Sequence, residues 1–179
     1  GQTLSDITIA YQTWGTLNAA CDNAILIQHA MTGWSDVPGW WPNMVGPGLA
    51  FDTNKYFVVC PNVIGGCQGS TGPSSIAPDG KRYGSRFPSV TIRDMVAAEI
   101  AFSDAIGIKK YKLAVGPSLG GMRSLEWAVD HPDRVDDAGD VAAERQEDVQ
   151  PEVQADAHLE KDADGRQKDG EENADDVHG

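Results

Sequence analysis

Residues 115–121 read Val115-Gly116-Pro117-Ser118-Leu119-Gly120-Gly121 and lie between two regular patterns. A short apolar run at 112–115 precedes them and is typical of a buried strand. Residues 122–129 follow at once and have the pattern of a helix. The order strand, turn and helix predicts a backbone that bends sharply at Ser118 and presents the serine hydroxyl at the tip of the turn.

The pattern Gly-x-Ser-x-Gly in this setting predicts the nucleophile elbow of an α/β-hydrolase fold, with Ser118 as the catalytic nucleophile. A strained backbone at the serine lifts its hydroxyl clear of the sheet. We expect glycine at positions 116 and 120 because side chains on Gly116 and Gly120 would collide in so tight a turn. The pentapeptide alone also arises by chance in unrelated proteins, so the flanking strand and helix are what favour catalysis.

Other periodic patterns indicate an α/β domain. Residues 6–13 alternate apolar and polar, which predicts a half-buried strand. Apolar runs at 24–27 and 56–60 predict central strands of a parallel sheet. A helix is expected over 91–106, since apolar residues recur there at helical spacing and Gly107 follows.

The chain has 179 residues and a net charge of −13, but its charge is unevenly distributed. Residues 1–135 contain 11 acidic and 10 basic residues, whereas residues 136–179 contain 16 acidic and 4 basic residues. The acidity therefore belongs to the C-terminal segment and says nothing about a substrate of the folded part. We predict a partial α/β-hydrolase domain over 1–135 and an acidic low-complexity tail over 136–179.

The tail contains no aromatic residue, isoleucine, serine or threonine. Such a segment cannot bury enough apolar surface to offset its ordering entropy, so residues 136–179 are predicted to be disordered. Its common residues all have codons that begin with G, which also fits a GC-rich gene read out of frame; the encoding DNA would decide. The sheet is expected to end at the strand 112–115, which would leave a hydrophobic edge unpaired.

The cysteines indicate a reducing compartment. Cys21, Cys60 and Cys67 are odd in number and lack metal-ligand spacing, so we expect free thiols in a cytoplasmic protein without a metal.

No apolar run approaches membrane-spanning length. The lysines of segment 109–112 are a small basic cluster that a solvated surface explains, and no other feature favours nucleic-acid binding. The glycine-rich segment 65–72 lacks the patterns of a phosphate-binding loop.

Acyl transfer through a serine needs a base and two donors for the developing oxyanion. In this fold one donor is the backbone N–H of the residue after the nucleophile, here Leu119. The second comes from a loop after an earlier strand, and we assign it to Met31 N–H in the segment 29–33. His29 is then expected to be a structural residue. The alternative, His29 as the base, disagrees with the usual order of serine, acid and histidine.

Several blocks of the chain closely resemble homoserine O-acetyltransferases, and the resemblance runs from about residue 4 to residue 135. The blocks that carry it are 29–33, 39–41, 45–48, 62–73, 87–95 and the elbow through 125–127. Members of this family are cytoplasmic, usually homodimeric enzymes of methionine biosynthesis with the α/β-hydrolase fold. They move an acetyl group from acetyl-CoA, a co-substrate, to the side-chain hydroxyl of L-homoserine through an acyl-serine intermediate, with no bound cofactor. The resemblance implies that Ser118 accepts the acetyl group and that the amides of Met31 and Leu119 form the oxyanion hole.

The chain also departs from the family pattern. The family usually has Gly-Gly-Ser-Met-Gly-Gly at the elbow, whereas this chain has Gly-Pro-Ser-Leu-Gly-Gly at 116–121. Succinyl transfer to homoserine and simple ester hydrolysis therefore stay open as alternatives. The family continues after Val135 with a further strand, a helical lid and the triad aspartate and histidine, which have no counterpart here. His158 and His178 follow no apolar strand that could hold them near Ser118. We therefore expect this chain alone to be inactive, and a non-catalytic fragment or interaction module is the alternative of another class.

Overall fold

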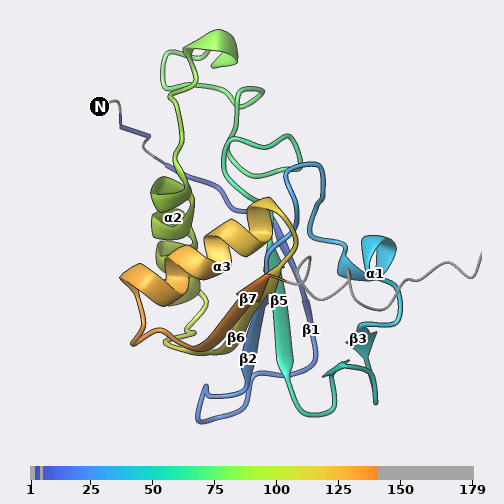
Figure 1. Ribbon diagram of the computed structural model, residues 1–179. Coiled ribbons are helices and arrows are strands. Elements are labelled where there is room, and N and C mark those ends of the chain that lie inside the picture. The colour runs from blue at the N-terminus through green and yellow to red at the C-terminus, as the bar shows by residue number, and fades with distance from the viewer. Residues whose placement is uncertain (1–2, 5, 141–179) are drawn as a thin grey trace, which may run out of the picture. The chain divides into compact units, whose positions relative to one another are not determined.

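The computed structural model describes residues 3–4 and 6–140 (Figure 1). Its main feature is a five-stranded sheet in the order β1-β5-β2-β6-β7. The strands are β1 (Tyr11–Trp14), β2 (Ala24–Ile27), β5 (Phe57–Pro61), β6 (Tyr111–Gly116) and β7 (Val135–Asp140). Strand β1 runs antiparallel to β5, and the remaining pairs are parallel. Because β2 and β6 are parallel neighbours, their carboxyl ends lie at the same edge of the sheet.

Two long helices cover one face of the sheet, and shorter elements cover the other. Helices α2 (Ile92–Ala105) and α3 (Leu119–Asp130) pack on one face, as Figure 1 shows. The opposite face is covered by helix α1 (Val37–Trp40) and the short strands β3 (Val45–Gly46) and β4 (Phe51–Asp52). A single 3-10 turn of the described chain spans Gly84–Arg86. Within the described part of the chain, every helix is too short or too polar to cross a membrane.

Strand β2 shows how the sequence builds two cores. Its residues are all buried, and successive side chains point to opposite faces of the sheet. Ala24 and Leu26 join the core beneath α2 and α3, which also contains Trp127. Ile25 and Ile27 join the core on the other face. The continuous apolar run that predicted a central strand at 24–27 is therefore explained by burial on both sides.

The predicted helix over 91–106 is confirmed as α2. It begins with a capping box, in which Thr91 Oγ1 accepts a hydrogen bond from the Asp94 N–H and the Asp94 carboxylate accepts one from the Thr91 N–H. These bonds satisfy two donors at the helix start that have no partner within the helix. Asp94 is therefore part of the cap that begins α2.

The N-terminal strand is shorter than the alternating pattern at 6–13 predicted. Pairing begins only at Tyr11, because the residues before it are bound to a loop. Thr8 N–H donates to Thr71 Oγ1 at 2.8 Å, and Ala10 N–H donates to Ser70 Oγ at 3.0 Å. The strand is also less buried than the alternation predicted, since three of its four residues are exposed.

Strand β7 corrects two expectations. Residues 136 onward were expected to lack structure, and the sheet was expected to end at 112–115, yet Val135–Asp140 pairs in parallel with β6. Val135 is buried, and Asp136 forms ion pairs with Lys110 and, at 3.5 Å, with Lys112. The backbone ladder and these charges stabilise a strand that side-chain hydrophobicity does not reveal. The prediction for residues 141–179 lies outside the described residues.

Candidate active site

Ser118 lies at the tip of the turn between β6 and α3, as its neighbours predicted. Its backbone has φ 54° and ψ −119°, a combination that residues other than glycine rarely adopt. The residue is exposed, although Leu119 directly after it is buried. Among the described residues, no hydrogen bond engages the Ser118 hydroxyl. The strained turn therefore holds an uncommitted hydroxyl at the surface.

The glycines on either side are required chiefly by a neighbouring strand. A Cβ on Gly116 would lie 1.9 Å from the backbone oxygen of Gln28, and one on Gly120 would lie 1.8 Å from it. Within the turn itself the nearest atom to a Cβ on Gly116 is the Gly120 Cα, at 3.1 Å. Glycine at both positions lets the carbonyl of Gln28, directly after β2, enter the elbow.

Met31 occupies a turn at the end of β2. Gly33 N–H donates to the Ala30 carbonyl at 2.9 Å, which places Met31 and Thr32 at the two central positions. The N–H groups of central turn residues are not used by the turn itself. Within residues 3–4 and 6–140, the Met31 N–H makes no hydrogen bond to another backbone group.

The second predicted donor is equally uncommitted. Leu119 is the first residue of α3, where backbone N–H groups have no partner within the helix. The turn at 30–33 and the start of α3 approach each other, since a Cβ on Gly120 would lie 3.2 Å from the His29 oxygen. The structure therefore brings Ser118 together with the segments that carry the Met31 and Leu119 amides, at the carboxyl edge of the sheet.

His29 has a structural environment. The ring is buried; Nδ1 lies 2.6 Å from the Ala30 oxygen, and Nε2 accepts from Val63 N–H at 3.2 Å. Burial lowers the pKa of His29 to about 4; the bond to Ala30 opposes this shift, and the charge of Arg123 adds to it. A neutral ring with a proton on Nδ1 satisfies both contacts. His29 thus links two loops and has no nitrogen left for Ser118.

No other described histidine can act on Ser118. His131 lies just beyond the last residue of α3, and a 12-residue helix is about 18 Å long. His158 and His178 lie outside the described residues. The part of the chain that the structure describes therefore supplies a candidate nucleophile and two candidate oxyanion donors, and places no histidine as their base.

Sequence reasoning missed two buried charges behind the elbow. Glu99 of α2 and Arg123 of α3 are 3% and 0% exposed, and they form an ion pair. A signal was present: Glu99 follows Val96 by three residues and precedes Phe102 by three, on the inward face of an amphipathic helix. A charge on such a face implies a buried partner.

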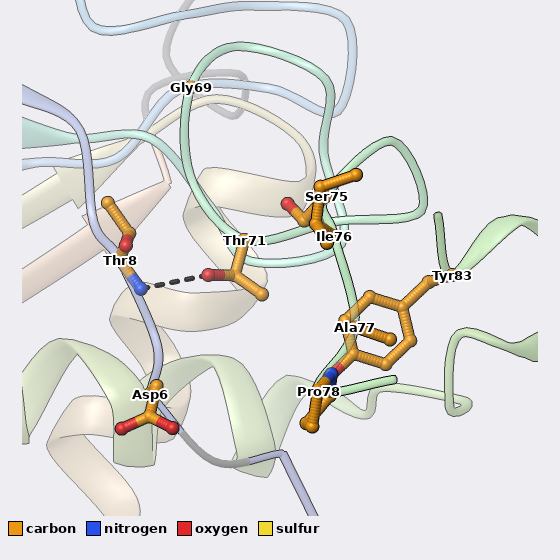
Figure 2. A pocket seen from close by; sticks show the side chains of 9 residues that line it. All are labelled: Asp6, Thr8, Gly69, Thr71, Ser75, Ile76, Ala77, Pro78 and Tyr83. Atoms are coloured by element: carbon orange, nitrogen blue, oxygen red, sulfur yellow. Dashed lines mark hydrogen bonds between the residues drawn. The ribbon is translucent and has the colours of Figure 1, made fainter. Parts of the chain in front are cut away.

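A cavity of about 410 Å³ lies elsewhere, between the N-terminal segment and the loop 69–83 (Figure 2). Figure 2 shows the hydrogen bond from Thr8 to Thr71 at its wall. Its lining residues are Asp6, Thr8, Gly69, Thr71, Ser75, Ile76, Ala77, Pro78 and Tyr83. None of the predicted site residues is among them, so this cavity is separate from the elbow.

Comparisons with known proteins agree with this geometry. Residues 23–158 match the family described as alpha/beta hydrolase fold. A homoserine O-acetyltransferase of Thermobifida fusca is 54% identical over 145 residues, which cover 75% of this chain and 38% of the relative. Among solved structures, esterase E22 has a TM-score of 0.71 at 36% identity, with 75% of this chain and 41% of that one covered.

A homoserine O-acetyltransferase from Bacillus anthracis has a TM-score of 0.68 at 35% identity, and the match covers 72% of this chain and 39% of that one. The predicted resemblance to the N-terminal part of such enzymes is thus confirmed. The chain spans 38% of the length of the Thermobifida fusca relative.

Proposed function

The chain belongs to the alpha/beta hydrolase fold family, and from that premise we propose that it is an acyltransferase of the homoserine O-acetyltransferase type. Its acyl donor would be acetyl-CoA and its acceptor the side-chain hydroxyl of L-homoserine. The observation that carries this proposal is Ser118, exposed on a backbone with φ 54° beside two uncommitted amides. Similarity to homoserine O-acetyltransferases at 54% identity supports the choice of substrates.

The proposed reaction has two steps. Ser118 Oγ attacks the thioester carbonyl while its proton passes to a base, and the N–H groups of Met31 and Leu119 stabilise the oxyanion. The C–S bond breaks, the CoA thiolate takes the proton, and acetyl-Ser118 remains. The homoserine hydroxyl then attacks this ester, its proton returns through the base to Ser118, and O-acetylhomoserine leaves. In this fold the base is a histidine that follows the nucleophile in sequence.

Acetylation of Ser118 by acetyl-CoA tests the proposal directly. We still expect no sustained turnover by this chain alone, because the triad aspartate and histidine are missing. An oxyanion hole without a complete triad retains about 10³–10⁴-fold catalysis over water, so the expected signal is a slow, single acetylation of Ser118 in the folded chain, detected by peptide mass spectrometry. The controls are Ser118→Ala and the same chain unfolded in urea. Equal modification of Ser118 in the folded and unfolded chain would contradict the proposal.

Ester hydrolysis is the second candidate, and the exposure of Ser118 to solvent favours it. The fate of acetyl-Ser118 separates the two, because a transferase passes the acyl group to homoserine and an esterase passes it to water. If the site is that of a transferase, added L-homoserine should speed the loss of the single acetyl group from Ser118 and yield O-acetylhomoserine, without sustained turnover. Succinyl-CoA in place of acetyl-CoA tests the choice of acyl group in the same assay.

A further inference from the structure

A buried polar cluster behind the elbow joins the residue directly after β2 to α2 and α3. The Glu99 carboxylate is its centre. One oxygen accepts from Arg123 Nη1, and the other accepts from Gln28 Nε2 at 2.6 Å and Trp127 Nε1 at 2.9 Å. Ser124 Oγ donates to the Gln28 side-chain oxygen at 2.7 Å. Both oxygens of the buried carboxylate thus have donors, as a desolvated charge requires.

Arg123 also reaches beyond this cluster. Its Nη2 donates to the backbone oxygen of His29 at 2.7 Å. His29 lies two residues before Met31, and Arg123 lies five residues after Ser118. One side chain therefore joins the helix that begins after the nucleophile to the loop that carries the other candidate oxyanion donor.

Neutralising Glu99 does not explain this second contact. A lysine at position 123 could pair with the Glu99 carboxylate, but it lacks the planar fork that presents two donors in fixed directions. Buried ion pairs are also weak contributors to stability compared with apolar residues of similar size. The bond to the His29 oxygen is thus the feature that only arginine supplies here.

We propose that Arg123 is a positioning residue that sets the separation of the Met31 and Leu119 amides. Glu99 orients the guanidinium, and the guanidinium holds the His29 carbonyl against α3. The inference rests on the proposed function, because oxyanion donors stabilise a transition state only when they are held at the right place beforehand.

Amide hydrogen exchange tests the positioning without any need for activity. In Arg123→Lys we expect the Gly33 N–H, which closes the turn around Met31, to exchange about tenfold faster relative to the amides of β2. Normalising to β2 removes any change in overall stability. The matched control is Arg93→Lys, since Arg93 is exposed and pairs with Glu126 and Asp130 on α3. An unchanged ratio in Arg123→Lys would overturn the proposal.

The acetylation assay gives the functional readout. Arg123→Lys should slow acetylation of Ser118 by about 10- to 100-fold and leave the acetyl-CoA concentration for half-maximal rate unaltered. The control variant Arg93→Lys should change neither the rate nor this concentration. If the wild-type chain shows no acetylation of Ser118, the proposed function fails, and the exchange experiment still decides the positioning role. If Arg123→Lys does not fold, Glu99→Gln keeps the volume and should speed Gly33 exchange in the same way; an unchanged ratio there also overturns the proposal.

Discussion

A single backbone carbonyl, that of Gln28, requires glycine two residues before and two residues after Ser118. It would overlap a Cβ on either elbow glycine, and it directly follows the central strand β2, whose neighbours hold it on both sides. The close approach brings β2 against α3. It is therefore part of what aligns the Met31 loop with Ser118.

Gly120→Ala should destabilise the protein by about 3 kcal/mol, because the added methyl overlaps backbone rather than a flexible side chain. Urea unfolding measures the change. The matched control is Gly139→Ala, where a Cβ meets no atom within 4 Å and φ is not in the left-handed region. Equal stability of the two variants would contradict the explanation.

Backbone strain at Ser118 should lower the stability of the folded chain while it exposes the serine hydroxyl. Glycine adopts a φ of 54° without the strain that a side chain causes there. The Ser118→Gly variant should therefore be about 1 kcal/mol more stable than Ser118→Ala. Neither variant can form acetyl-Ser118. Thermal unfolding of the two variants side by side checks this, and a more stable alanine variant would show that the turn is unstrained.

His29 predicts a pH dependence. Its folded pKa of about 4 lies below its usual value of 6.5, so the unfolded state binds more protons between these pH values. The free energy of unfolding should therefore fall as pH is lowered from 6.5 to 4, by about 2–3 kcal/mol in all. His29→Gln should lack this component when urea unfolding is compared across the same pH range. Parallel pH profiles would contradict a neutral buried ring.

At the scale of elements, β7 is the unexpected part of the sheet. It covers the edge of β6 and contributes Val135 to the core beneath α2 and α3. Its remaining side chains are polar or small, and Asp136 pairs with lysines of the neighbouring strand region. The element thus protects the sheet edge with charge, as natural edge strands do.

Val135→Ala should cost about 2 kcal/mol, because Val135 is 5% exposed and its methyl groups fill the core. Val129→Ala makes the same chemical change on α3 at a position that is 73% exposed, and should be nearly neutral. The midpoints of denaturant unfolding compare the two variants, provided that the dependence of the unfolding free energy on denaturant is the same in both. If Val135→Ala is also neutral, β7 does not pack as described.

At the scale of the whole described fold, the two cores share one sheet. Strands β2 and β5 contribute side chains to both faces, so neither core can unfold without exposing the other. This predicts a single cooperative transition. Val96→Ala in one core and Val37→Ala in the other should both shift it, with circular dichroism and tryptophan fluorescence coinciding. Separate transitions by the two probes would show that the faces unfold independently.

The sequence alone determined the elbow, the strand at 24–27 and the helix over 91–106, because each depends on residues close together in the chain. Periodic burial and the capping box at Thr91 and Asp94 are local signals of this kind. The resemblance to homoserine O-acetyltransferases likewise came from contiguous blocks.

Only the tertiary structure decided the rest. The Gln28 carbonyl at the elbow, the link from Arg123 to the His29 oxygen, and the pairing of Val135–Asp140 with β6 join residues far apart in sequence. Every residue has a backbone oxygen, so the sequence does not show which one makes a particular contact. A strand ladder likewise forms whether its side chains are polar or apolar. The contacts that surround Ser118 are mostly of this kind, so local patterns predicted the sharp turn at Ser118 and not what holds its surroundings in place.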